Sequence, residues 1–116
     1  RTAFDLDIIR DRNQLFRENF NGEIENSYTL KVLNQSQNTV TYRLSLTELA
    51  EEYKWMGETQ VTVGAGSVET LPVTLAVDPK LLDDTRNDFY FVITTESDNG
   101  ETETLRQESR FFKGHR

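Results

Sequence analysis

The side chains that could support nucleophilic or metal chemistry are few in this sequence. Common nucleophilic mechanisms pair a serine or cysteine with a histidine base, but the chain has no cysteine and one histidine, His115. A base next to a chain end is poorly placed to be held in a fixed position. Copper sites use clustered histidine, methionine or cysteine ligands, and this chain offers only Met56 and His115. We therefore predict no catalytic, no cofactor-binding and no metal-binding residue in this segment.

The acidic residues raise the possibility of a calcium site. Four aspartates lie within residues 78–88. Calcium loops of the EF-hand type need oxygen ligands at alternate positions, a central glycine and a terminal glutamate, and this segment lacks that pattern. We therefore interpret it as a solvated loop with a helical turn. No spacing nominates a carboxylate pair for acid–base catalysis either.

Three arginines, Arg10, Arg12 and Arg17, mark the one candidate binding surface. They lie in a segment where polar and charged residues precede a Leu-Phe pair. One interpretation is an exposed crossover between strands, with the apolar pair tucked under the sandwich, because charged runs are usually solvated. The alternative is a surface whose arginines contact a partner protein or lipid headgroups.

Charge and length limit the remaining classes of function. The chain of 116 residues has a formal net charge of −7, whereas nucleic-acid-binding proteins concentrate positive charge, so we expect no nucleic-acid partner. This length suits one domain with one core. No apolar run approaches the ~20 residues needed to cross a bilayer. Because the sequence starts with arginine rather than methionine, we expect a segment of a longer protein.

Period-two alternation of apolar and polar side chains predicts strands, and no long segment has helical periodicity. We therefore predict an all-β fold, an immunoglobulin-like two-sheet antiparallel β-sandwich of about seven strands. We predict that residues 1–116 form a single domain, with the first strand and the arginine-rich crossover in 1–21, the sandwich body in 22–112 and a tail in 113–116. The predicted strands are residues 4–10, 28–33, 40–46, 60–63, 68–77, 89–95 and 103–112.

The pattern also predicts how some strands are joined. Residues 24–46 are expected to form one antiparallel hairpin, with the polar run 34–38 as its exposed turn. The Asn-Gly pairs at 21–22 and 99–100 are typical of tight turns. Trp55 is expected to cover one open end of the core, since large aromatic side chains are usually buried.

Several motifs together resemble the C-terminal immunoglobulin-like domain of FixG/CcoG-type proteins. The arginine-rich run followed by Ile-Glu-Asn-x-Tyr is fairly specific, whereas the later strands would fit many bacterial sandwich domains. The resemblance covers nearly the whole chain. Its residues are Arg10–Arg17, Gly22, Ile24–Asn26, Tyr28–Lys31, Trp55–Gly57, Leu71–Leu75, Asp78–Pro79 and Arg110–Phe112.

This resemblance implies a fragment of a bacterial inner-membrane protein, with the present domain on the periplasmic side of that membrane. The parent family has several transmembrane helices and cysteine motifs that bind two [4Fe–4S] clusters. It is linked to assembly of cbb-type cytochrome c oxidase and to reduction of Cu(II) to Cu(I). The cluster cysteines lie upstream, so the resemblance implies no cofactor in this segment.

Three functions remain open at this point. The first is a non-catalytic accessory domain that docks the parent membrane protein to oxidase-assembly or copper-delivery proteins, with Arg10, Arg12 and Arg17 near the membrane. The alternative is a free-standing bacterial adhesion or carbohydrate-binding module, which would be expected to expose a row of aromatic side chains. A third possibility, direct copper binding by the domain, lacks the clustered ligands that copper prefers.

Overall fold

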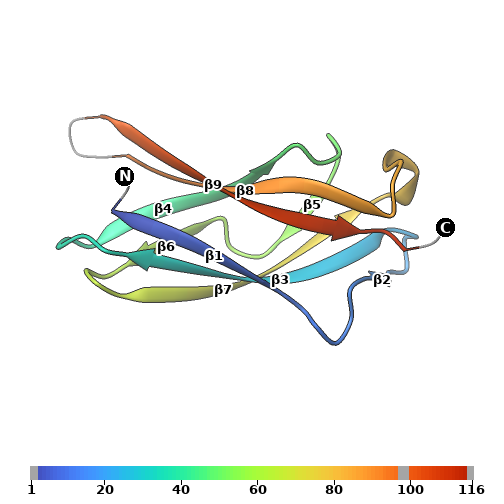
Figure 1. Ribbon diagram of the computed structural model, residues 1–116, viewed down its shortest axis with the longest axis horizontal. Coiled ribbons are helices and arrows are strands. Elements are labelled where there is room, and N and C mark those ends of the chain that lie inside the picture. Colours follow the sequence, from blue (N-terminus) through green and yellow to red (C-terminus); the bar gives the residue numbers. More distant parts are fainter. Residues whose placement is uncertain (1–2, 97–99, 115–116) are drawn as a thin grey trace.

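Two antiparallel sheets packed face to face make up the fold (Figure 1). This computed structural model describes residues 3–96 and 100–114. One sheet has the strand order β1-β3-β7-β5 with β2 paired to β3, and the other has the order β6-β4-β8-β9. The predicted all-β two-sheet sandwich is confirmed. The elements are β1 (Phe4–Arg10), β2 (Arg17–Glu18), β3 (Ile24–Asn34), β4 (Val40–Thr47), β5 (Lys54–Met56), β6 (Gln60–Val63), β7 (Val68–Val77), the 3-10 helix η1 (Pro79–Leu81), β8 (Arg86–Glu96) and β9 (Thr102–Phe112).

The core lies between the inner faces of the sheets, where alternate residues of each long strand are buried. In its centre the Tyr28 ring meets the Phe91 ring edge-on, with ring centroids 5.1 Å apart, and Phe89 packs against Phe91 at 5.0 Å. Such edge-to-face aromatic pairs stabilise a core beyond the area they bury. The apolar side chains that hold the sheets together are buried. Among them are Tyr28, Leu30, Leu44 and Phe91.

Hydrogen bonds between β3 and β9 tie the two sheets together along one side. The Tyr28 hydroxyl donates to the backbone oxygen of Arg110 at 2.7 Å. The Asn26 side chain donates to the backbone oxygen of Phe112 and accepts from its amide, both at 2.8 Å. Because these polar groups are buried, each bond also avoids the cost of an unpaired donor or acceptor.

The expected hairpin over residues 24–46 is wrong. Strand β3 pairs with β1 and β7, whereas β4 pairs with β6 and β8, so the two arms belong to different sheets. Both arms turn alternate side chains into the same core, and a period-two pattern is therefore the same for a hairpin and for a crossover between sheets. The difference lies in the connection.

That connection is organised by Asn34, whose side chain is fully buried rather than exposed in a turn. Its Nδ2 donates to the backbone oxygens of Asn38 at 2.8 Å and Val63 at 3.0 Å, and lies 3.2 Å from the oxygen of Gly64. Its Oδ1 accepts from the amide and the hydroxyl of Ser36. Asn34 thereby joins the end of β3 to the turn after β6 and directs the chain into the second sheet.

Two short strands, β2 and β5, raise the number from the expected seven to nine within residues 3–96 and 100–114. Trp55 lies in β5 and packs edge-on against Phe91 at 5.8 Å, so it covers the core as expected but from a strand. The residues between β4 and β5 are irregular. The turn expected at Asn99-Gly100 includes residues that lie outside the described ranges. His115 also lies outside them.

The acidic segment that follows β7 contains the expected helical turn. The Asp78 carboxylate accepts the amide of Lys80 at 3.0 Å and so caps η1. Among the described residues, no three histidine, cysteine, aspartate or glutamate side chains gather into a group able to hold a metal ion. Within the same residues, no helix has the length and apolar character that crossing a bilayer requires.

The role of Asn34 predicts a large loss of stability on its removal. Replacing Asn34 with alanine leaves several buried backbone groups without partners, so we expect the free energy of unfolding to fall by about 2–4 kcal/mol in urea denaturation. Gln37→Ala, at an exposed position of the same connection, is the matched control and should change it by less than about 0.5 kcal/mol. Equal effects of the two substitutions would contradict this role.

Candidate partner-binding surface

The structure separates the three predicted arginines into two environments. Arg10 ends β1, and its guanidinium carbon lies 5.0 Å from the centre of the Phe112 ring on β9. Arg10 and Arg12 both line a hollow of about 450 Å³ over β1, β3 and β7. Arg17 instead forms an ion pair with Glu25, Nε to Oε1 at 2.7 Å. The arginines therefore do not form one continuous cationic surface.

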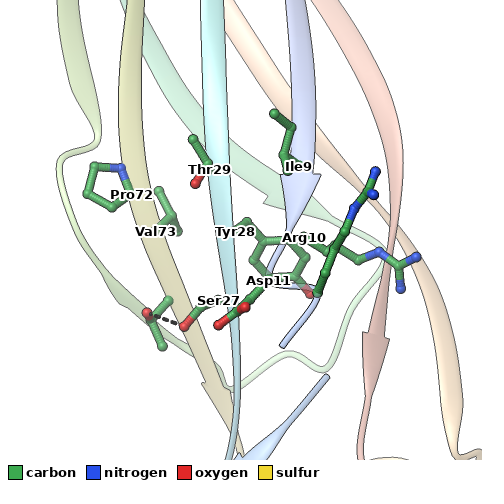
Figure 2. Close-up of a pocket in the computed structure, with 10 residues that line it drawn as sticks. Ile9, Arg10, Asp11, Ser27, Tyr28, Thr29, Pro72 and Val73 are labelled. Atoms are coloured by element: carbon green, nitrogen blue, oxygen red, sulfur yellow. Dashed lines mark hydrogen bonds between the residues drawn. The ribbon is translucent and has the colours of Figure 1, made fainter. Parts of the chain in front are cut away.

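The hollow is lined by both polar and apolar side chains, as Figure 2 shows. Ile9, Thr29 and Pro72 are register neighbours across β1, β3 and β7 on the outer face of the sheet. The hydroxyls of Ser27 and Thr74 are bonded to each other at 3.0 Å. Asp11, on the same hollow, accepts the amide of Asn13 at 3.0 Å, so the contacts of these polar side chains are to neighbouring parts of the fold.

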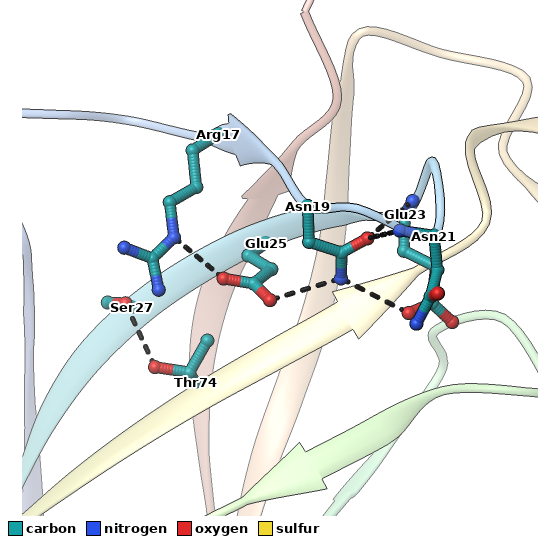
Figure 3. Close-up of polar contacts among 7 residues, drawn as sticks. All are labelled: Arg17, Asn19, Asn21, Glu23, Glu25, Ser27 and Thr74. Carbon is teal, nitrogen blue, oxygen red and sulfur yellow. Dashed lines mark hydrogen bonds and ion pairs between the residues drawn. The ribbon is translucent and has the colours of Figure 1, made fainter.

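A polar network follows β2 and the start of β3 (Figure 3). Asn19 Nδ2 donates to Glu25 at 3.1 Å and to Glu23 at 3.2 Å, while Arg17 pairs with Glu25 and Lys54 Nζ lies 3.1 Å from Glu23. The hydrogen bond from Asn19, helped by Arg17, lowers the pKa of Glu25 below its ordinary value of 4.5. Asn19 and then Lys54 lower the pKa of Glu23 in the same way.

Asn19 also orders the turn between β2 and β3. Its Oδ1 accepts the amides of Asn21 at 2.9 Å and Glu23 at 3.0 Å. Its backbone accepts from the amide of Gly22 at 3.1 Å and donates to the oxygen of Glu23 at 2.9 Å. Gly22 has a φ of +78°, a conformation that favours glycine. The tight turn expected at Asn21-Gly22 is confirmed. Hydrogen bonds from both the side chain and the backbone of Asn19 hold it.

Three apolar side chains that flank β2 in the sequence remain exposed, and we call Leu15, Phe16 and Phe20 the apolar tip. Leu15 is 50% exposed, Phe16 is 38% exposed and Phe20 is fully exposed. The expectation that the Leu-Phe pair is tucked under the sandwich is therefore wrong. The loop runs outside the filled core, and the Phe16 ring lies against Gly114, where an added Cβ would be 2.6 Å from the ring.

Sequence reasoning missed Phe20 altogether. The usable signal was a lone phenylalanine flanked by two asparagines and followed by glycine, which places a large apolar side chain inside a turn. A turn residue points into solvent unless other parts of the chain cover it, so exposure at this position follows from the tertiary structure.

Comparison with known proteins assigns the chain to a family. A family model described as the "IG-like fold at C-terminal of FixG", with FixG given as a candidate oxidoreductase, matches residues 1–114. The chain belongs to the FixG C-terminal domain family. The resemblance drawn from the sequence motifs is confirmed by this match. A comparison with the curated proteins finds no match.

Solved structures agree with this assignment. A FixG-related protein from Vibrio parahaemolyticus, known from its crystal structure, has 38% sequence identity and a TM-score of 0.85, over 98% of this chain and 99% of that one. The crystallised FixG-related chain has almost the same extent as this one, so a chain of this length folds on its own in that relative.

Two further structures are similar in fold alone. A structural-genomics target named SoR45 has 13% identity and a TM-score of 0.62, over 97% of this chain and 88% of that one. The GAE domain of yeast GGA1 has 8% identity and a TM-score of 0.57, over 92% and 90%. At such identities they support the sandwich architecture of the FixG domain and no more.

The lowered pKa of Glu25 predicts a pH-dependent effect of Glu25→Gln. At about pH 7 the charged carboxylate stabilises the fold, so the substitution should lower the free energy of unfolding by about 1–2 kcal/mol. This stabilisation is complete above the unfolded-state pKa and is lost as pH falls through the lower folded-state pKa. The difference from wild type should therefore shrink steadily below about pH 4.5 in urea titrations.

Glu69→Gln, at an exposed position on β7, is the matched control for this measurement. It should show little difference from wild type at either end of the pH range. A difference for Glu25→Gln that stays constant down to about pH 3 would contradict the assigned network.

Proposed function

We propose that this FixG C-terminal domain is a non-catalytic accessory domain on the periplasmic side of the bacterial inner membrane, where it docks its parent protein to partner proteins. The observation that carries the proposal is the family match over residues 1–114 on a sandwich with a filled apolar core. Expected partners are the rest of the parent membrane protein and proteins of oxidase assembly or copper delivery.

The buried polar side chains of the domain support a structural rather than a chemical role. Asn26 bonds β9, Asn34 bonds the connection between the sheets, and Glu25 bonds Arg17 and Asn19. Each of these groups is engaged in holding the fold. A catalytic group, by contrast, needs a free position facing a substrate.

The redox chemistry proposed for the parent belongs outside this segment. Iron–sulfur clusters are held mainly by cysteine thiolates, and none of the 116 residues is a cysteine, so this chain does not fit either of the two [4Fe–4S] clusters. Reduction of Cu(II) to Cu(I), with its link to assembly of cbb-type cytochrome c oxidase, is accordingly proposed for the parent as a whole.

The direction of β1 bears on where the arginines lie relative to the parent. β1 begins at the end of the sandwich opposite the one that carries β2 (Figure 1). Its seven residues span about 20 Å at the usual rise of a strand. Any chain that precedes β1 joins at its Phe4 end, so the segment with Arg12 and Arg17 is far from that junction. We therefore favour contact with a partner over contact with the membrane for this segment.

Deletion of residues 4–112 from the full-length parent tests the proposal. We expect assembly of cbb-type oxidase in membranes to fall several-fold, while the purified parent retains its Cu(II) reduction, because the domain positions partners and holds no redox group. Parent levels matched by immunoblot are the control. Unchanged assembly together with unchanged copper reduction would overturn docking, and loss of copper reduction in a folded parent would overturn the non-catalytic role.

A further inference from the structure

Phe20 is unusual because a well-ordered turn holds it fully exposed. A large aromatic side chain in water forgoes roughly 2 kcal/mol or more of the hydrophobic stabilisation that burial would provide. A flexible loop could fold such a ring back onto the protein surface. Here the hydrogen bonds of Asn19 fix residues 19–23 and keep the ring pointing away.

This arrangement has the properties of a binding hot spot. Hot spots are few, are enriched in aromatic residues and bind best when their geometry is set before the partner arrives, because less side-chain and loop entropy is then lost. Leu15 and Phe16, just before β2 in the sequence, are exposed apolar side chains as well. The hollow beside Phe20 is lined by residues of the same turn and network.

The charges near the apolar tip indicate which kind of partner fits. The two cations of the network are already neutralised, since Arg17 pairs with Glu25 and Lys54 pairs with Glu23. They therefore contribute little net positive charge to the surface around Phe20.

Acidic groups near the apolar tip are not matched in this way. Glu18 lines the same hollow as Phe20, and it takes part in none of the ion pairs found among the described residues. Asp78 is close enough to Glu23 for the two carboxylates to repel each other. An anionic bilayer would be repelled by such a surface, whereas a protein pocket rimmed by lysine or arginine would be attracted.

We propose that the apolar tip, with Phe20 as its anchor, inserts into an apolar pocket rimmed by basic side chains on a protein partner. This inference rests on the proposed docking function and names its surface. Asn19 acts as a positioning residue, because it holds the turn and makes no contact with the partner itself.

The first experiment identifies the occupant. A photoreactive benzoylphenylalanine placed at position 20 of the full-length parent should cross-link one defined protein in intact cells. The same group at Val68, an exposed apolar position on β7, is the matched control and should not yield that product. Cross-linking to lipid alone, or to the same products from both positions, would overturn the proposal.

The second experiment measures affinity between the cross-linked protein, once purified, and the isolated 116-residue domain. Phe20→Ala should weaken binding by about ten-fold or more, and Val68→Ala by less than about two-fold. Asn19→Ala should weaken binding several-fold although Phe20 is present, because the turn is then loose. Wild-type affinity for Phe20→Ala, in a variant whose thermal unfolding matches wild type, would overturn the proposal.

Lipid contact is tested by flotation of the same domain with vesicles of phosphatidylethanolamine and phosphatidylglycerol. We expect no binding, and binding that depends on Phe20 would overturn the choice of a protein partner.

The experiments also distinguish a wrong binding surface from a wrong proposed function. If deletion of residues 4–112 impairs oxidase assembly while Phe20→Ala binds the partner normally, docking stands and its surface lies elsewhere.

Discussion

The contact between Tyr28 and the opposite sheet is the interaction on which the rest of the structure depends. Its ring packs edge-on against Phe89 and Phe91, and its hydroxyl donates across the sandwich to Arg110. Tyr28 therefore takes part both in the apolar core and in the hydrogen bonds that tie β3 to β9 along one side of the sandwich. Burial raises the pKa of Tyr28, so the hydroxyl stays protonated and remains a donor. The domain needs no disulfide because such contacts hold the sheets together.

The sequence predicted most strands but not how they are connected. Alternation located β1, β7, β8 and β9, because burial of every second side chain is a local property of a strand. It could not show that β3 and β4 part into different sheets, since that choice depends on the bonds of Asn34 to residues far along the chain. A polar run looks the same whether its asparagine faces water or closes a buried crossover.

The candidate surface was predictable only in part. The arginines were visible as a charged run, but pairing of Arg17 with Glu25 and stacking of Arg10 on Phe112 depend on which strands become neighbours. The exposure of Phe20 could not be predicted from its residue type, because phenylalanine side chains are usually buried. Phe20 is exposed because the hydrogen bonds of Asn19 hold the turn in a conformation that leaves the ring uncovered.

We propose that the domain recognises a partner through one pre-ordered end while its core stays closed. Hydrogen–deuterium exchange of the full-length protein, alone and in complex with its partner, tests this most directly. We expect the protection gained on binding to be confined to residues 15–23 and exchange in β3 and β8 to be unchanged. Protection centred on the hollow over β1, β3 and β7, or spread through the core strands, would contradict it.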